Sequence, residues 1–391
     1  MDKRVYLLTI VSFVVGLVEL IIGGILDLLA NDLHITIGKA GLLITIFSLV
    51  FAISAPLLLA TTAKIERKKL TLIALFVFLL GNLIAVISPS FNILMLARIV
   101  SAASGSLLIV LCVTLASNIV DKQYRARAIG IVFMGVSGSL VLGVPIGLML
   151  GNAFGWRAPF IFITLLTIFS IVGVYLYMGK IEPKPAISLR KQISTLKEKK
   201  IFFAQMTTFL FLAGHLTLYA YLTPFLKTTL GLNGTWVSIV YLAFGIAAVI
   251  GGGVGGVLSD KFGSKPTIIL VTIIFAFSIF IIPYTTILLP LFLVVMVIWS
   301  MMSWAITPAI QSYLIETAPE TSDIQQSLNN SALHFGIAFG SFVGGVVIEQ
   351  ATVEFNPTIG GLITLLALGA ATISMKKTIG VRASTKVKGY E

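Results

Sequence analysis

Long apolar stretches alternate with short polar segments along the whole chain. Most of these stretches are near the roughly 20 residues that a helix needs to cross about 30 Å of hydrocarbon. We expect helices because backbone polar groups find no water in lipid, and the short alternating segments of a membrane barrel are not seen. The predicted spans are residues 5–29, 41–62, 70–87, 91–120, 128–151, 159–178, 201–226, 236–258, 267–282, 289–315, 330–348 and 357–375.

One polar segment is much longer than the others and divides the spans six and six. It is rich in basic residues and contains prolines, as expected of a linker on a membrane surface. We predict an N-terminal six-helix bundle over residues 1–179, a cytoplasmic linker over 180–200, and a C-terminal six-helix bundle with a cytoplasmic tail over 201–391. Pairs of glycines recur in the two halves at the same sequence offset, which indicates a weak internal repeat. Duplicated halves are typical of secondary transporters.

The composition excludes most other classes of protein. Hydrophobic residues make up 58% of the chain and charged residues 11%, against about 25% charged in an average soluble chain. A soluble enzyme, a disordered protein and a disulfide scaffold are therefore excluded, and Cys112 is the single cysteine. The sequence contains no Walker-type phosphate loop, metal-ligand cluster, catalytic triad or redox motif, so we expect neither an enzyme nor a cofactor or metal.

The net charge of +12 is a topology signal, because its placement is uneven. Most lysines and arginines lie at the two termini, in the long linker and in the loops on the same side, while the opposite loops hold few. This asymmetry predicts a multi-pass protein of the cytoplasmic membrane with both termini in the cytoplasm. It does not indicate nucleic-acid binding.

Glu19 is a candidate proton carrier because it lies near the middle of the first span. About 15 residues of helix place it roughly 22 Å from the start of the span. A carboxyl group at that depth is expected to face a cavity or a partner, or to be protonated. The alternative is a structural carboxyl that bonds a neighbouring helix. Asp27 lies two turns further along, and we expect it at the membrane interface.

Two histidines also lie at mid-membrane positions. His215 is followed one turn later by Tyr219, and it can relay a proton or hydrogen-bond a heterocycle. It can equally be a neutral core residue. His334 lies in the eleventh span among serines at helical spacing, so we predict it as a cavity residue, with a core role as the alternative.

A polar and aromatic stripe on the tenth span predicts cavity lining. The alternative is hydrogen bonding between helices by small polar residues. We favour the cavity because a tryptophan can stack on a flat ring. The predicted lining residues are Ser303, Trp304, Thr307 and Gln311.

Arg98 and a glycine-rich segment are predicted to serve conformation rather than binding. Arg98 lies inside the fourth span, where it must pair with a carboxylate, a helix end or water. In the fifth span, Gly143, Pro145 and Gly147 thin one helix face and permit a bend, which suits an interface that rocks; the alternative is close packing alone.

Together these motifs resemble the major facilitator superfamily. The segment from Gly256 to Gly263 is similar to the family's signature loop, in which Asp260 would help to lock one conformation. The N-terminal copy departs from that pattern, since Leu59, Ala63 and Glu66 replace glycine, aspartate and glycine. Leu96-Ala-Arg98 resembles the motif of the fourth span, and Gly143-Val-Pro145-Ile-Gly147 resembles the antiporter motif of the drug:proton branch.

Several segments are similar to bacterial purine base and nucleoside efflux pumps. These are Tyr124-Arg-Ala-Arg-Ala-Ile-Gly130, Ala213-Gly-His215-Leu-Thr-Leu-Tyr219 and Gln311-Ser-Tyr-Leu-Ile-Glu316, while Gly16-Leu-Val-Glu19 resembles the broader sugar- and purine-efflux cluster. One departure is Asp27, which stands where a proline is usual.

The resemblance implies a proton-coupled antiporter that exports purine bases, nucleosides or analogues by alternating access. Glu19 and His215 would couple protons, and Tyr219, the tenth-span stripe and His334 would line the cavity. The expected partners are the small-molecule substrate, protons and the lipid bilayer, with no nucleic acid, and a monomer is expected. The alternatives are a multidrug:proton antiporter of the same fold and a passive facilitator that does no uphill work.

Overall fold

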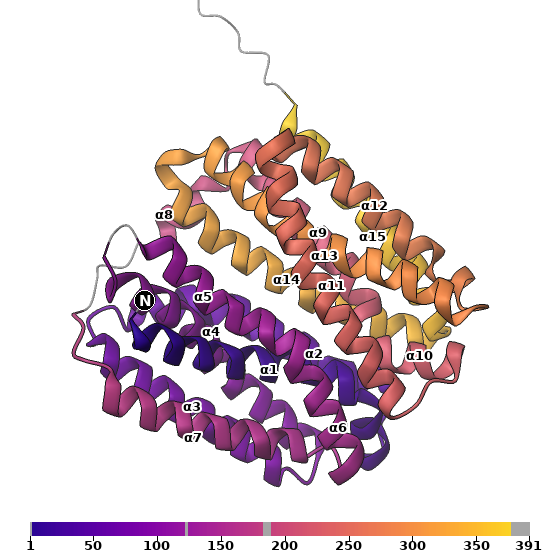
Figure 1. The fold of residues 1–391 in the computed structure, drawn as a ribbon, viewed down its shortest axis with the longest axis horizontal. Helices are drawn as coiled ribbons and strands as arrows, with labels where there is room; N and C mark the ends of the chain where they lie inside the picture. Colours follow the sequence, from indigo (N-terminus) through magenta and orange to yellow (C-terminus); the bar gives the residue numbers. More distant parts are fainter. Residues whose placement is uncertain (1, 122–123, 183–188, 377–391) are drawn as a thin grey trace, which may run out of the picture.

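Nearly every described residue belongs to a helix, as a lipid environment requires (Figure 1). The computed structural model describes residues 2–121, 124–182 and 189–376. Among them, 12 helical segments are long and apolar enough to cross a membrane, which confirms the predicted all-α membrane fold. The fifth crossing is built from two α-helices joined by a π-helical turn.

The elements of the first half are α1 (Lys3–Asp32), α2 (Ile37–Thr61), α3 (Arg67–Ile87), α4 (Phe91–Asn118), α5 (Arg125–Gly138), η2 (Ser139–Gly143), α6 (Val144–Phe154) and α7 (Ala158–Tyr177). A short helix, α8 (Leu189–Thr195), follows. The elements of the second half are α9 (Lys199–Tyr219), α10 (Leu222–Leu230), α11 (Thr235–Phe262), α12 (Ser264–Thr285), α13 (Leu289–Thr317), η3 (Pro319–Thr321), α14 (Ser322–Gln350), η4 (Val353–Phe355) and α15 (Asn356–Met375).

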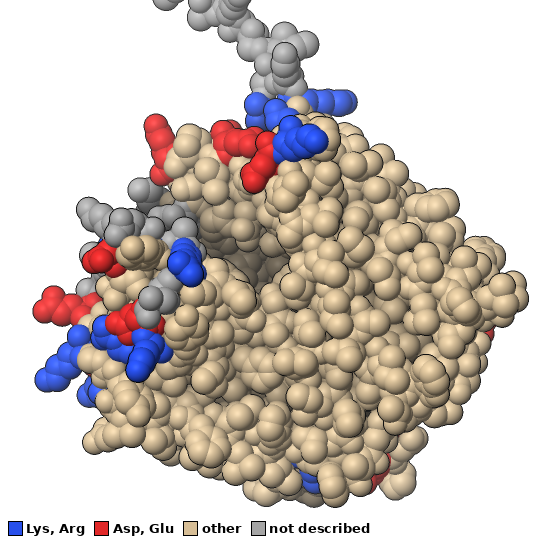
Figure 2. All heavy atoms as spheres, in the orientation of Figure 1, with Lys and Arg blue, Asp and Glu red and all other residues tan. Residues whose placement is uncertain are grey.

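The helices form two groups that lie side by side, α1–α7 and α9–α15 (Figure 1). The start of α1, the helix α8 and the end of α15 lie at one end of the molecule, which we call the terminus side. Charged side chains gather on this side, whereas the visible surface between the two ends is formed by other residue types (Figure 2). Figure 2 also shows a hollow that opens between the groups on the terminus side.

Glycines at one-turn spacing pack helices closely in both groups. Gly147 and Gly151 of α6 lie against the side chains of α1, and a Cβ atom at Gly151 would lie 3.0 Å from Ile25 Cγ2. Gly340 and Gly344 of α14 lie in the same way against the backbone of α9, next to Ala213 and Thr217. The fifth and eleventh crossings thus occupy equivalent positions, in agreement with the internal repeat. Gly147 thus packs against a helix of its own group rather than against the second group.

The antiporter-like segment forms a π turn. Residues Ser139–Gly143 are π-helical, and Pro145 follows within the first turn of α6. Proline cannot donate a backbone hydrogen bond, so the preceding turn widens. The widened turn also contacts the other group, because a Cβ atom at Gly245 of α11 would lie 2.7 Å from Val141 Cα. The predicted departure from a regular helix therefore coincides with a contact between the groups.

Glu66 binds the beginning of the linker to the loop between α2 and α3. Its carboxylate accepts hydrogen bonds from the N–H groups of Lys68 at 2.8 Å, Lys69 at 2.9 Å and Ile181 at 2.9 Å. The N–H of Arg67 donates to the carbonyl of Ile181 at 3.0 Å. Partial burial raises the pKa of Glu66, but the hydrogen bonds from Ile181, Lys69 and Lys68 outweigh it and hold the pKa below its usual value.

Substitution by alanine is expected to have opposite effects on stability at two neighbouring glycines of α11. A Cβ atom at Gly251 would clash with the backbone of Met301 in α13, whereas nothing lies within 4 Å of one at Gly252. We expect Gly251→Ala to cost about 1–3 kcal/mol of stability through overpacking. Gly252→Ala should be neutral or stabilising, because alanine favours the helix. Thermal unfolding midpoints in detergent compare the two, and equal midpoints would contradict the packing of α11 on α13.

Glu66→Ala should destabilise the protein by about 1 kcal/mol at pH 7, because it removes a helix cap. The control is Glu198→Ala, since Glu198 holds the same capping position before α9 without a side-chain cap bond. The lowered pKa of Glu66 means that its stabilisation is complete above the unfolded value and is lost as the pH falls through the folded value. The stability difference between wild type and Glu66→Ala should therefore shrink on acidification, and a pH-independent difference would contradict this role.

Candidate functional site

Glu19 of α1 and His334 of α14 meet between the two helix groups. Their Oε1 and Nδ1 atoms are 3.4 Å apart. The side chain of Glu19 is 15% exposed and that of His334 is 5% exposed. Both residues were predicted as cavity residues, but nothing in the sequence indicated that they would face each other. The contact joins the two groups through two side chains that can each gain or lose a proton.

Arg98 and two phenylalanines surround this pair. Arg98 of α4 is fully buried, and its Nη1 donates to the carbonyl of Val18 at 2.7 Å, which places the guanidinium close enough to Glu19 for electrostatic interaction. Its guanidinium also lies 3.9 Å from the ring centre of Phe47. The ring of Phe51 lies 4.1 Å from the imidazole of His334. Helix α1 therefore carries the acid, α4 supplies the arginine beside it, α2 supplies the two phenylalanines, and α14 supplies the histidine.

His215 lies in a separate aromatic cluster within the second group. Its imidazole stacks on Tyr219 of the same helix at 5.2 Å and faces Trp299 of α13 at 5.3 Å. Phe244 of α11 also belongs to the cluster, at 4.8 Å from Tyr219. His215 and Tyr219 are thus brought together as predicted, but the histidine beside Glu19 is His334. Trp299 was missed, although it belongs to the same stripe of α13 that contains Ser303.

The predicted stripe of α13 divides into bonded and half-buried residues. Ser303 is buried and donates to the carbonyl of Ser300 in its own helix at 2.7 Å, so this bond does not join two helices. Trp304, Thr307 and Gln311 are half-buried. The backbone carbonyl of Gln311 accepts a hydrogen bond from Gln326 of α14 at 3.5 Å. Cavity lining by the half-buried residues stays a prediction.

The signature-loop residues lie on the terminus side. Asp260 is exposed near the end of α11, and Gly263 follows with a φ of 90°, which favours glycine. Gly263 thus ends α11 and allows α12 to begin at the next residue. The latch role of Asp260 stays a prediction.

On the side opposite the termini, the two groups are joined at a kink in α1. Ile25 departs from helical geometry with φ −105° and ψ 17°. Thr223 Oγ1 of α10 lies 3.1 Å from the carbonyl oxygens of both Gly23 and Gly24 and donates to them. The hydroxyl of Tyr241 in α11 donates to Gly23 at 3.4 Å. The second group therefore satisfies the carbonyls beside the kink.

Two polar contacts strengthen this joint. Asp27 of α1 forms an ion pair with Lys227 of α10, and the side chains are 12% and 30% exposed. Thr36, at the start of α2, donates to Glu349 of α14 at 2.6 Å. Asp27, the departure from the expected proline, thus takes part in a contact between the groups.

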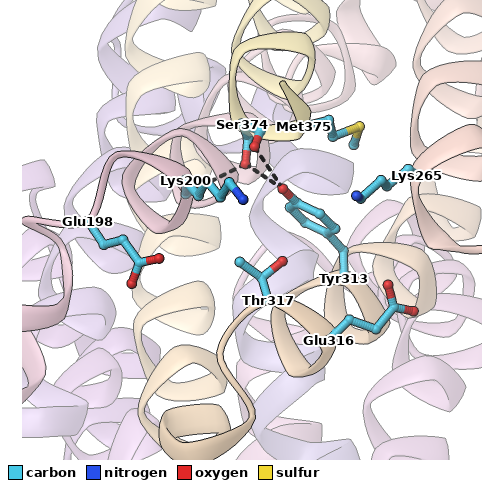
Figure 3. A pocket seen from close by; sticks show the side chains of 8 residues that line it. All are labelled: Glu198, Lys200, Lys265, Tyr313, Glu316, Thr317, Ser374 and Met375. Atoms are coloured by element: carbon cyan, nitrogen blue, oxygen red, sulfur yellow. Dashed lines mark hydrogen bonds between the residues drawn. The ribbon is translucent and has the colours of Figure 1, made fainter. Parts of the chain in front are cut away.

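Two surface cavities lie apart from Glu19 and His334. One has a volume of about 390 Å³, opens on the terminus side and contains lysine, glutamate and hydroxyl side chains around Tyr313 (Figure 3). Its lining residues are Glu198, Lys200, Lys265, Tyr313, Glu316, Thr317, Ser374 and Met375. The other, of about 570 Å³, is an apolar groove between α2, α9 and α14. Among the described residues, no cluster of three His, Cys, Asp or Glu side chains can hold a metal.

The comparisons with known sequences agree on one family. The Major Facilitator Superfamily profile matches residues 8–341. An uncharacterized MFS-type transporter of Bacillus subtilis, YbcL, is 35% identical and the alignment covers 95% of each chain. The inner membrane transport protein YdhP of Escherichia coli is 27% identical, again over 95% of each chain.

Solved transporters share the fold at low identity. A bacterial homologue of the human lysosomal transporter Spinster, in an inward-facing and occupied conformation, has a TM-score of 0.77 at 17% identity and covers 95% of this chain and 96% of its own. A D-xylose–proton symporter also has a TM-score of 0.77, at 16% identity, and covers 95% of this chain and 97% of its own. These likenesses establish the fold and leave the substrate open.

Asp27→Asn should weaken the joint opposite the termini, because it removes the charge that Lys227 pairs with. We expect a loss of about 1 kcal/mol, or about fivefold, in the population of the joined state. The measurement is the distance distribution between spin labels at the exposed positions Asn31 and Asn233, with Cys112→Ser as background. The control is Asp32→Asn, because Asp32 pairs with Arg157 inside the first group. A shift as large in Asp32→Asn would contradict a specific role for Asp27.

Proposed function

The chain belongs to the Major Facilitator Superfamily and is a membrane transporter, and we propose that it is a proton-coupled antiporter that exports purine bases, nucleosides or close analogues. In this proposal it acts as a monomer in the cytoplasmic membrane. The terminus side faces the cytoplasm, as the distribution of basic residues favours. The hollow between the groups is then the route by which cargo enters from inside the cell.

The contact between Glu19 and His334 carries the proposal. One partner belongs to each helix group, so the free energy of the contact depends on how the groups are placed. It also depends on whether each side chain holds a proton. Protonation and rocking of the groups are therefore energetically linked, which is what coupling requires. Burial close to Arg98 makes the link stronger than at a water-exposed site.

The direction of transport follows from exchange at this site. A proton that reaches Glu19 from outside favours release of the cargo, and its loss to the cytoplasm restores affinity. The joint at the α1 kink separates and re-forms in each cycle as the groups rock. The antiporter-like segment Gly143-Val-Pro145-Ile-Gly147 supports exchange over passive facilitation. The purine assignment is supported by the sequence segments that resemble purine efflux pumps and by the aromatic cluster around His215.

Glu19→Gln should abolish uphill transport while leaving downhill exchange intact, because the amide keeps the shape of the side chain and cannot carry the proton. Uptake of radiolabelled hypoxanthine into everted membrane vesicles, driven by an acid interior, measures the uphill reaction. Exchange at equal pH on both sides measures the downhill one. The control is Glu316→Gln, since Glu316 bonds Ser264 on the surface of the second group at 2.8 Å.

Three results would argue against parts of the proposal. Unchanged uphill uptake in Glu19→Gln would remove Glu19 from coupling. Wild-type uptake that ignores the pH gradient would favour a facilitator. Gradient-driven transport of cationic dyes without purine transport would favour a multidrug antiporter.

A further inference from the structure

Three polar atoms in the aromatic cluster around His215 lack hydrogen-bond partners within the described residues. They are Nδ1 of His215, the hydroxyl of Tyr219 and Nε1 of Trp299. All three side chains are more than nine-tenths buried, and Trp299 is fully buried. Burying a hydrogen-bonding group without a partner costs free energy, so three such atoms in one cluster require an explanation.

Among the described residues, unpartnered buried atoms also occur on serine, asparagine and arginine side chains, but the other buried tyrosines are all bonded. Tyr221 donates to the carbonyl of Ser341 at 2.7 Å, Tyr241 donates to Gly23, and Tyr313 donates to Ser374 at 3.0 Å. The buried Trp156 likewise donates to Asp32 at 2.7 Å. A purely structural aromatic core would be expected to bond its hydroxyl and indole N–H groups in the same way.

The rings of the cluster contact one another and carry the three unpaired polar atoms at their edges. The rings come from three helices, with Phe244 of α11 at 5.0 Å from Trp299 of α13 and 6.1 Å from His215 of α9. Tyr219 ends α9 where that helix reaches the other group, because a Cβ atom at Gly23 of α1 would lie 3.5 Å from the carbonyl of the next residue, Ala220. The cluster therefore lies beside the interface along which the groups rock.

We propose that this cluster binds an uncharged, flat nitrogen heterocycle by stacking and by hydrogen bonds to the three unpaired atoms. An indole N–H can only donate, so the ligand must present an acceptor to Trp299. The hydroxyl of Tyr219 and Nδ1 of His215 can each donate or accept, so they fit a ring edge with both an acceptor and an N–H. A permanently charged cation would gain contact with the rings but would leave these atoms unpaired.

This inference rests on the proposed function. It assigns cargo recognition and proton binding to two different places in the protein. Cargo is recognised within the second group by His215, Tyr219 and Trp299, and the proton is held between the groups by Glu19 and His334. Specificity for the ring and coupling to protons are then separable by mutation. Removal of the Tyr219 hydroxyl should change affinity without changing whether transport depends on the pH gradient.

The test compares two Tyr→Phe variants that should behave in opposite ways. Tyr219→Phe removes a hydroxyl that has no partner, so the thermal unfolding midpoint should stay the same or rise, while hypoxanthine affinity should fall about tenfold. Tyr313→Phe removes a hydroxyl bonded to Ser374, so the midpoint should fall while affinity stays the same. Trp299→Phe and Trp156→Phe form a second pair, because the indole N–H of Trp156 is bonded to Asp32. Calorimetric titration in detergent measures affinity for hypoxanthine, benzimidazole and tetraphenylphosphonium.

The possible outcomes test the heterocycle site and the purine assignment separately. Selective weakening of hypoxanthine binding in Tyr219→Phe and Trp299→Phe supports it. Equal hypoxanthine affinity in wild type and all four variants overturns it and leaves purine export standing. If wild type binds benzimidazole but not hypoxanthine, with the same loss in Tyr219→Phe, the site is supported and the purine assignment falls. Binding of tetraphenylphosphonium alone overturns the site as described.

Discussion

The free-energy cost of an unpaired polar group in hydrocarbon is the constraint on which the rest of the structure depends. It requires nearly all of the described residues to be helical. It leaves few places where a backbone group or a charged side chain can bond a new partner. Those places coincide with the contacts between the two helix groups. At the α1 kink, carbonyls of Gly23 and Gly24 are bonded by Thr223 and Tyr241 of the other group. Near the middle of α1, Glu19 meets His334.

The same constraint shapes how the helices pack within and between the two groups. Within each group, helices approach through glycines and form packed units, as Gly147 does on α1 and Gly340 does on α9. Between the groups, α2 packs closely on α14, where Gly38 lies against the backbone of Gly345, and the widened turn before Pro145 and a few polar contacts add to this packing. Glu66 adds a tie between the first group and the beginning of the linker, where the family pattern has a glycine.

The fold could be predicted from the sequence because hydrophobic length and the distribution of basic residues are local properties. Glu19 could be found for the same reason, since a carboxylate inside an apolar run is conspicuous. Its partner could not, because the meeting of α1 and α14 depends on how the two halves face each other. Asp27 and Lys227 are each unusual charges, but they lie on different halves, so their pairing required the fold.

Aromatic residues were the hardest to interpret. Trp304 was favoured for stacking, whereas the structure places Trp299 beside His215 and Tyr219. The two tryptophans are separated by little more than one turn of the same helix. From the sequence alone, a buried aromatic residue looks the same in a hydrophobic core as in a binding site. The distinguishing feature is an indole N–H without a partner, which only the three-dimensional arrangement reveals. The role of Glu66 could not be predicted from the sequence either, because its contact with Ile181 joins residues far apart in the sequence.

The most direct test of the central claim is proton release from purified protein in weakly buffered detergent as hypoxanthine is added. Exchange of cargo for a proton through Glu19 predicts release by wild type, no release by Glu19→Gln, and hypoxanthine binding by both. Binding to wild type without proton release, or equal release by Glu19→Gln, would contradict the account.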